Sequence, residues 1–412
     1  MGLTTIGLGV AVVSLLIWIG LLMLWGRFWL CDQRLAPVNE TGAAARLEGY
    51  PPVCAVIPAR NEAEMLPQTL RSLLGQTYTG PFHIILVDDH STDGTGEIAR
   101  QIAIELNQAK QLTVLSAEPL PPGWTGKLWA MEQGIRHAQT LASAPSYFLF
   151  TDADIQHAPD NLHQLVSKAQ ADNRELVSLM VLLRCQSFWE KLLLPAFVFF
   201  FQLLYPFPLV NTPSSRVAAA AGGCILIRRE TLERIGGISI LKQALIDDCT
   251  LAQAVKLGSR SAPDAISAHT DPLKPSRRIW LGLTQTTYSL RPYDSLQTIW
   301  DMVARTAYTQ LNYSPLLLVG TVLGMTLVYL VAPIATVVGL LIGHWAIALV
   351  GLAAWLLMAL AYWPTIRLYS LNPLWSFCLP VIAFLYTLMT LDSARRHWQG
   401  RGGAWKGRIY PS

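Results

Sequence analysis

Three pairs of acidic residues recur in the central part of the chain: Asp88-Asp89, Asp152-Ala153-Asp154 and Asp247-Asp248. Two carboxylates at one place repel each other and any phosphate group. A magnesium or manganese ion would remove both repulsions and would stabilise the charge on a departing diphosphate. A carboxylate can also act as a general base that takes a proton from a hydroxyl group. The pairs therefore indicate chemistry on a phosphorylated substrate.

The first two pairs stand at the ends of predicted strands. Asp88-Asp89 closes the segment 84–87, and Asp152 follows a second, aromatic segment. Neighbouring residues of an extended chain face opposite ways, so one acid of Asp88-Asp89 should reach a ligand while the other braces the loop. Residues two apart face the same way, about 7 Å apart, so Asp152 and Asp154 could serve a divalent cation and a nucleotide sugar together. Turn-forming acids are the structural alternative for Asp88-Asp89.

The third pair opens a helical pattern at 249–255. Acids are favourable at the amino end of a helix, so Asp247-Asp248 could be a helix cap. The functional alternative is a general base held near the reacting carbon of a sugar. Both interpretations are open at the level of the residues alone.

The segments between Pro51 and about Leu273 predict the scaffold that positions these acids. Short β-branched strands alternate there with amphipathic helices. The pattern is seen at 53–57, 63–75, 84–87, 94–106 and 112–115. This alternation predicts an α/β domain with a mostly parallel sheet covered by helices. Ligands of such sheets bind at the carboxyl ends of the strands, which is where the acids stand.

Composition places part of the chain in a membrane. Of the 412 residues, 52% are hydrophobic and only 14% are charged, against roughly 25% charged residues in soluble domains. The formal net charge of +4 is small, and no basic run interleaves with aromatic residues. Nucleic acid is therefore not expected as a partner.

Apolar stretches at both ends of the chain are long enough to cross a bilayer. Residues 6–25 lack a cleavage site and are followed by arginines, which predicts an uncleaved anchor with a cytoplasmic carboxyl end. Residues 315–363 predict two spans with a turn at Gly343-His344-Trp345, and 374–391 predict a third. Three spans after a cytoplasmic domain would put the tail outside, whereas its basic residues favour the inside. One of the three segments could therefore be re-entrant or interfacial.

A further apolar segment, 192–210, lies between the second and third acidic pairs. A single crossing there would separate Asp154 from Asp248, so if these acids share a site the segment must lie in the membrane interface or dip and return. A buried core helix is the alternative, although three prolines disfavour a continuous one. The predicted divisions are an anchor at 1–26, a cytoplasmic catalytic domain at 27–310, two to three membrane helices at 311–392 and a basic tail at 393–412.

Four motifs, in this order, resemble those of the inverting family 2 glycosyltransferases, whose catalytic domain has the GT-A fold. They are Val56 to Glu62, Val87 to Thr95, Asp152 to Asp154 and Asp247-Asp248. The resemblance implies that Pro58, Glu62, Asp88 and Asp89 hold the nucleoside, and that Asp154 is the main metal ligand beside Asp152. It places Asp248 as the catalytic base and Asp247 where the family usually has Glu. Lys127 lies in a segment similar to lipid-directed members and is expected to meet the diphosphate.

Over nearly its whole length the chain is most similar to bacterial hopanoid-associated glycosyltransferases and, more distantly, to carotenoid and ceramide glycosyltransferases. This resemblance implies a GT-A domain between membrane helices, in a bacterial inner membrane, with the catalytic domain in the cytoplasm. It implies metal-dependent transfer of one sugar, with inversion, from a nucleotide-diphosphate sugar, foremost a UDP-sugar, to a lipid hydroxyl such as that of a hopanoid.

One family signature is missing. Processive synthases carry Gln-x-x-Arg-Trp after the base, and neither Arg277-Arg278-Ile279-Trp280 nor Trp300 with Arg305 matches it. This favours a single transfer. Arg277, Arg278 or the tail segment 405–408 could aid the diphosphate, or could anchor the chain at the membrane surface. The alternative functions are a processive polysaccharide synthase, a lipid transporter and a non-enzymatic scaffold.

Overall fold

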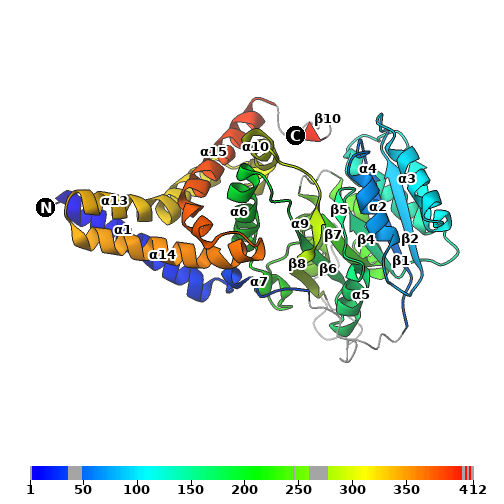
Figure 1. Ribbon diagram of the computed structural model, residues 1–412, viewed down its shortest axis with the longest axis horizontal. Coiled ribbons are helices and arrows are strands. Elements are labelled where there is room, and N and C mark those ends of the chain that lie inside the picture. Colours follow the sequence, from blue (N-terminus) through cyan, green and yellow to red (C-terminus); the bar gives the residue numbers. More distant parts are fainter. Residues whose placement is uncertain are drawn as a thin grey trace. The chain divides into compact units, whose positions relative to one another are not determined.

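The computed structural model describes residues 2–35, 49–242, 244, 246–258, 277–400, 404–405 and 408–409. The chain divides into two compact units, each assembled from separate stretches (Figure 1). The sheet unit consists of Gln33–Leu183 and Leu209–Arg291. The helical unit consists of Met1–Asp32, Arg184–Pro208 and Pro292–Ser412.

The sheet unit is built on one mixed sheet, whose strands within the described residues follow the order β3-β2-β1-β4-β7-β6-β8-β5. The strands are β1 (Val53–Ala59), β2 (Phe82–Asp88), β3 (Leu112–Ser116), β4 (Tyr147–Thr151), β5 (Ile155–Gln156), β6 (Leu176–Leu182), β7 (Cys224–Arg228) and β8 (Ile279–Ser289). The α/β class predicted from the alternating pattern is confirmed. The parallel arrangement holds among β1 to β4 and between β6 and β8, whereas β7 and β5 run antiparallel to their neighbours.

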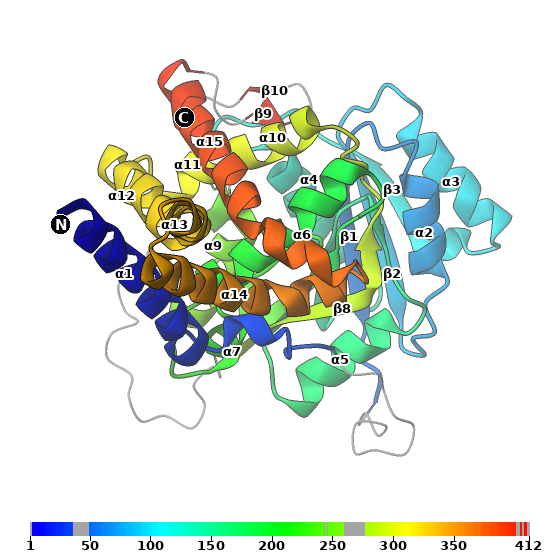
Figure 2. The same cartoon turned by 60° about the vertical axis from the view of Figure 1, so that its left-hand side comes forward.

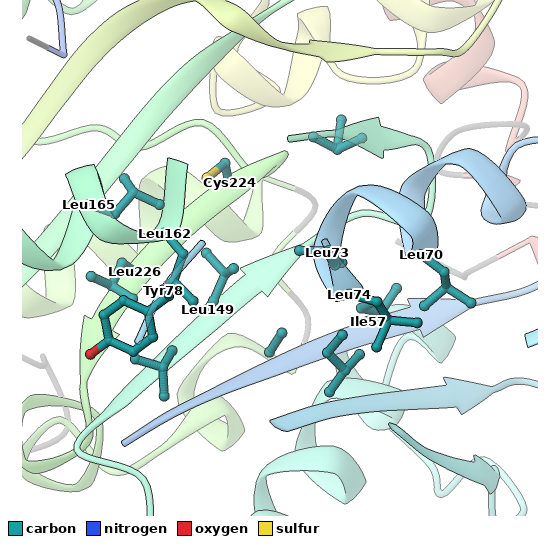
Figure 3. Packing of buried hydrophobic residues seen from close by; sticks show 14 of the residues in the cluster. Ile57, Leu70, Leu73, Leu74, Tyr78, Leu149, Leu162, Leu165, Cys224 and Leu226 are labelled. Atoms are coloured by element: carbon teal, nitrogen blue, oxygen red, sulfur yellow. The ribbon is translucent and has the colours of Figure 1, made fainter. Parts of the chain in front are cut away.

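Helices cover both faces of this sheet. They are α2 (Leu66–Leu74), α3 (Thr95–Glu105), α4 (Gly126–Ala138), α5 (Asn161–Ala171), α8 (Arg229–Arg234) and α9 (Asp247–Leu257). Successive residues of β1 face opposite ways, so Ile57 packs with α2 in the main core while Val56 meets Gly134 of α4. Figure 3 shows part of that core, where Leu70 and Leu73 of α2 lie beside the strands.

The helical unit contains the long apolar helices. Its elements are α1 (Gly2–Leu24), α6 (Phe188–Leu204), α10 (Leu296–Ala304), α11 (Ala307–Gln310), α12 (Pro315–Met325), the π-helical turn η6 (Thr326–Leu330), α13 (Val331–Leu341), α14 (Trp345–Leu368), the 3-10 segment η7 (Pro373–Cys378) and α15 (Leu379–Trp398). A short helix, α7 (Phe207–Asn211), stands at the boundary between the units. In Figures 1 and 2, α1 and α14 lie side by side.

Four helical stretches of the described chain are long and apolar enough to cross a membrane: Thr4–Leu24, Pro315–Leu341, Trp345–Leu368 and Pro373–Trp398. The first agrees with the predicted anchor. The next two are separated at Gly343, as the sequence predicted, and this glycine has a φ of 69° that favours glycine. Length and composition alone therefore support association with a membrane.

The apolar segment 192–210 is helical over most of its length, because α6 continues through Pro195 and ends before the two later prolines. Ser187 and Glu190 form a capping box at its start. Its middle is buried within the helical unit, where Leu193, Leu194 and Phe199 are fully covered.

Candidate active site

The carboxyl ends of three neighbouring parallel strands bring the predicted motifs to one edge of the sheet. Ala59, the last residue of β1, is paired with Asp88, the last residue of β2. On the other side, β1 pairs in parallel with β4, and Asp152 follows Thr151 at the end of that strand. Asp88 and Asp152 therefore lie at the ends of strands, as the sequence predicted.

The Asp88-Asp89 pair organises the loop after β2. One carboxylate oxygen of Asp88 accepts the backbone N–H of Ser91 at 3.0 Å. Asp89 is only 3% exposed, and its carboxylate lies 3.6 Å from the guanidinium of Arg60, which also donates to the Asp89 carbonyl oxygen at 2.6 Å. Asp88 is thus the more exposed of the two acids and also the one that braces the loop.

Glu62 is tied to the start of α3. Its backbone N–H donates to the Thr95 hydroxyl at 2.9 Å, and its side chain is almost fully buried. Asp93 accepts backbone N–H groups from Ala63 and Thr95. Partial burial opposes ionisation of Asp93, but a hydrogen bond from the Thr95 hydroxyl together with these N–H groups outweighs it and lowers the pKa of this carboxyl group. The loop after β1 and the loop after β2 are in this way joined by charge-assisted hydrogen bonds.

Lys127 connects the second and third acidic pairs. It lies in the first turn of α4, where the Thr125 side chain caps the helix. Its ammonium group is 2.8 Å from Asp152 and 3.8 Å from Asp247. Burial alone would lower the pKa of Lys127, but the carboxylates of Asp152, Asp247 and Asp248 raise it, so this lysine is a fixed positive charge.

Asp248 lies in the first turn of α9 and accepts two backbone hydrogen bonds. The donors are the N–H of Gly222 at 2.9 Å and that of Cys249 at 2.7 Å. Burial and the neighbouring Asp247 raise the pKa of Asp248 to about 6, against the opposing effect of Lys127 and the two N–H groups. A carboxylate with this pKa is mostly ionised at neutral pH and still basic enough to take a proton.

One pocket gathers these groups. Its lining includes five predicted site residues: Pro58, Lys127, Asp152, Asp247 and Asp248. Apolar side chains form much of the remaining wall, among them Leu128 of α4, Ile225 of β7 and Leu251 of α9. Polar groups converging in an otherwise apolar pocket are typical of a substrate site.

Two further predicted residues are held by an arginine that sequence reasoning missed. Arg291 donates from Nε to Asp154 at 2.6 Å and from Nη2 to both carboxylate oxygens of Glu62, at 2.9 and 3.2 Å. The pairing of β5 with β8 places Arg291 there, and the Leu290 N–H donates to the Asp154 carbonyl oxygen. Burial raises the pKa of Asp154, Arg291 opposes this effect, and Asp152 and Glu62 add to it.

The further basic residues that the sequence offers for the diphosphate are Arg277, Arg278 and the tail segment 405–408. Arg277 and Arg278 precede β8 and are exposed, whereas Arg291 follows the strand. Lys406 in the tail lies outside the described residues. The signal in the sequence is that Arg291 lies just after a strand of the same sheet. The sequence does not show that this strand, β8, pairs with β5, and that pairing is what brings Arg291 to Asp154.

The acidic residues offer a limited donor set for a metal ion. Among the described residues, no group of three or more His, Cys, Asp or Glu side chains is placed to hold one. Magnesium can be held by one or two carboxylates when substrate phosphates and water supply the remaining oxygens. Asp152 and Asp154 fit that reduced set, although Lys127 and Arg291 already pair with them.

The mixed sheet with acids at its strand ends, between long apolar helices, defines a GT-A-type α/β protein. A solved structure with a similar fold is a mannosyltransferase from Pyrobaculum calidifontis in complex with GDP-Man and Mn2+, at a TM-score of 0.50 and 19% identity over 94% of this chain and 97% of that one. Residues 54–236 match the family model Glycosyl transferase family 2. This match agrees with the predicted enzyme class, a glycosyltransferase.

Curated relatives match shorter stretches. An uncharacterized protein of Methanocaldococcus jannaschii, MJ1222, is 32% identical over 114 residues, which is 28% of this chain and 40% of the relative. The 4,4'-diaponeurosporenoate glycosyltransferase of Staphylococcus haemolyticus is 30% identical over 123 residues, 30% of this chain and 29% of the relative. The chain thus spans well under half the length of these relatives, and the distant likeness to carotenoid glycosyltransferases is confirmed.

Proposed function

We propose that the chain is a membrane-bound glycosyltransferase that transfers one sugar from a nucleotide-diphosphate sugar to the hydroxyl group of a membrane lipid. The observation that carries the proposal is the pocket in which Lys127 joins Asp152 to Asp247, with Asp248 beside them. A fixed cation and a carboxylate with a pKa of about 6 in one pocket suit the departure of an anion and the removal of a proton.

Asp248 is the general base of the proposed reaction. Its carboxylate takes the proton of the acceptor hydroxyl while the hydroxyl oxygen forms a bond to the anomeric carbon of the sugar. The bond from that carbon to the diphosphate breaks, and the attack from the opposite face inverts the configuration. The N–H groups of Gly222 and Cys249 hold the carboxylate in one orientation for this step.

Lys127 is proposed to neutralise the diphosphate as it leaves. Its raised pKa keeps the ammonium group charged, and its contact with Asp152 fixes its position. A magnesium or manganese ion at Asp152 and Asp154 would supply further positive charge to the same oxygens. Pro58, Glu62, Asp88 and Asp89 are proposed to hold the nucleoside; the loops that carry them meet at the ends of β1 and β2.

A lipid is the proposed acceptor because long apolar helices stand at both ends of the chain. The relatives named for a carotenoid acid support an acceptor of this class, and a hopanoid hydroxyl is the first candidate. The segment with α6 leaves the sheet unit after β6 and returns before β7, and these two strands pair with each other. An odd number of crossings between them is therefore impossible, which supports a position of α6 at the membrane surface. The arginines that follow the first apolar helix support a cytoplasmic domain in a bacterial inner membrane.

The test is transfer of label by the full chain in bacterial membranes. The protein is incubated with a panel of labelled UDP- and GDP-sugars and a bacterial lipid extract, with and without manganese. We expect a chloroform-soluble labelled product with one donor and loss of the product without the metal. Label found only in an insoluble polymer would refute single transfer and support a processive synthase.

The matched variants are Asp248→Asn and Asp172→Asn. Asp248→Asn should bind nucleotide normally and lose transfer by at least about 100-fold, because the amide cannot take the proton. Asp172 pairs with Lys168 at the end of α5, away from the pocket residues, and its variant should transfer normally. Equal activity of both variants would remove Asp248 from the mechanism.

A further inference from the structure

The last apolar stretch, Pro373–Trp398, is long enough to cross a membrane by composition. We propose that it does not cross, and that α15 instead lies along the bilayer surface on the side of the sheet unit. The chain would then cross three times, through α1, through α12 with α13, and through α14. This inference does not depend on the reaction proposed above; it rests on contacts within the helical unit and on chain connections.

Polar contacts bind the carboxyl end of α15 to α10. The indole N–H of Trp300 donates to Asp392 at 2.8 Å, and Arg396 donates to Asp301 at 2.7 Å. Arg396 also pairs with Asp392 at 2.7 Å, and the charged groups remain partly exposed. Such a cluster belongs in water or among lipid headgroups, because charges are costly inside the hydrocarbon core.

The amino end of α10 is close in sequence to the sheet unit. Arg291 ends that unit, and α10 begins at Leu296 after only four residues, 292–295. Four residues cannot cross a hydrocarbon core of about 30 Å. The helix α10, and with it the carboxyl end of α15, is therefore on the same side of the membrane as the sheet unit.

The carboxyl end of α14 is on that side as well. Thr365, near the end of α14, and Cys31 lie in contact, with hydroxyl and thiol 3.4 Å apart, and both residues are buried. Cys31 is followed closely by Gln33, where the sheet unit begins. The stretch 369–398 thus starts and ends at one membrane face, and a segment of this kind cannot be a single crossing.

The packing of the other helices agrees with three crossings. Ala11 of α1, Ala335 of α13 and Ile347 of α14 form one buried cluster. With the Cys31 to Thr365 contact at the other end, this makes α1 parallel to α14. The indole N–H of Trp18 donates to the Val328 carbonyl oxygen, so α13 runs antiparallel to α1, as alternating crossings require.

The exposed face of α15 suits the boundary between headgroups and acyl chains. Val381, Phe384 and Leu391 lie on one side of the helix and are 60%, 47% and 40% exposed. Leu379 to Leu391 extend about 20 Å at 1.5 Å per residue before Asp392, so α15 alone is shorter than the core thickness of about 30 Å and could cross only together with η7. Figure 1 shows α6 and α15 running across the direction of α1 and α14 within the helical unit. This arrangement is that of an interfacial helix.

The proposed arrangement also explains how the basic tail can lie on the cytoplasmic side, although the chain has three apolar stretches after the sheet unit. With three crossings the tail shares the side of the sheet unit, where the basic residues Arg395 and Arg396 and those beyond them are favoured. With four crossings those residues would be on the opposite side.

The test is labelling of single cysteines with a membrane-impermeant maleimide, in the full-length protein in intact bacterial cells and in inverted membrane vesicles. Cys185→Ser and Cys378→Ser remove the two native thiols that are not buried. Asn372→Cys and Gln399→Cys then bracket α15, and Ile342→Cys marks the turn between α13 and α14; all three positions are exposed. We expect Asn372→Cys and Gln399→Cys to react only in inverted vesicles and Ile342→Cys only in cells.

Labelling of Gln399→Cys and Asn372→Cys from opposite faces would overturn the proposal. Labelling of both from the outer face would support the single-face arrangement and would refute the cytoplasmic orientation of the proposed function instead. A second measurement uses a carboxyl-terminal fusion to green fluorescent protein or to alkaline phosphatase. Fluorescence without phosphatase activity is expected, and active phosphatase would overturn the tail position.

Discussion

At the scale of single residues, two cations, Lys127 and Arg291, balance the charge of buried and half-buried acids in the site. Lys127 lies against Asp152 and Asp247, and Arg291 lies against Asp154 and Glu62. Carboxylates brought together in a partly dry pocket resist ionisation unless a cation is near. Asp152, Asp247, Asp154 and Glu62 are therefore each paired with a positive group that comes from another element.

The raised pKa of Asp248 predicts how the rate of sugar transfer depends on pH. A general base acts only when deprotonated, so transfer should rise about tenfold per pH unit below the pKa and level off above it. The midpoint is expected near pH 6, where burial and Asp247 place this carboxyl group. Asp247→Asn removes one of the two causes and should move the midpoint to lower pH. Rates of transfer at saturating donor, measured from pH 4.5 to 8, check this; an unmoved midpoint would contradict it.

Arg291→Gln tests the second cation. The variant leaves Asp154 and Glu62, both nearly buried, without their guanidinium partner. We expect a loss of stability of about 1–3 kcal/mol without divalent cations. Manganese should recover more stability in the variant than in the unchanged protein, because the ion neutralises the same carboxylates. Thermal unfolding in detergent measures both effects.

Arg278→Gln is the matched control, since this exposed arginine precedes β8 whereas Arg291 follows it. It should unfold as the unchanged protein does. Equal manganese effects in all three proteins would show that the ion does not share carboxylates with Arg291.

At the scale of elements, the position of Lys127 depends on how closely α4 packs on the sheet. Gly134 of α4 faces β1, and a Cβ atom at this position would lie 2.5 Å from a methyl carbon of Val56. No side chain fits without displacement of the helix or the strand. A helix so close to β1 holds Lys127 beside the strand end that carries Asp152.

Gly134→Ala should therefore destabilise the protein by about 1–3 kcal/mol through overpacking. Gly134→Ala with Val56→Ala should recover part of the loss, since the second change removes the clashing methyl groups. Gly324→Ala in α12 is the control, because a Cβ there would meet nothing within 4 Å. Unfolding temperatures in detergent compare the two single variants and the double variant. A loss of stability in Gly134→Ala no greater than that in Gly324→Ala would contradict the packing argument.

At the scale of the whole molecule, membrane association has two separate sources. The anchor α1 precedes the sheet unit, and the other long apolar helices follow it. Either group could hold the chain in a bilayer, because each span buries about 20 apolar residues.

Deletion of residues 2–24 should leave the chain in the membrane fraction after washing with alkaline carbonate. The helices from α12 onward are the physical reason, since their exposed faces carry large apolar side chains such as Leu316, Leu341 and Trp345. Fractionation and immunoblotting measure the outcome, with a peripheral protein as the control that carbonate releases. Release of the shortened chain would show that α1 alone provides the anchor.

The sequence by itself determined the features that depend on local pattern. Alternation of strands and helices established the α/β class. The acids at strand ends were expected to lie along one edge of the sheet, and they do so because parallel strands end together. Apolar length predicted the long apolar helices and the turn at Gly343. The roles assigned to the individual acids come from resemblance and remain predictions.

Only the tertiary structure decided which distant segments meet. The antiparallel β7 and β5 were not predicted, because strand order depends on the packing of whole elements rather than on the pattern within each. Arg291 reaches Glu62 across 229 residues of sequence, and nothing local to either residue indicates the other. The same holds for the contact of Arg396 with Asp301, which determines the side of the tail in the proposed topology. Pairing between remote residues is a property of the folded chain, since it follows from the order and direction of the strands and helices that carry them.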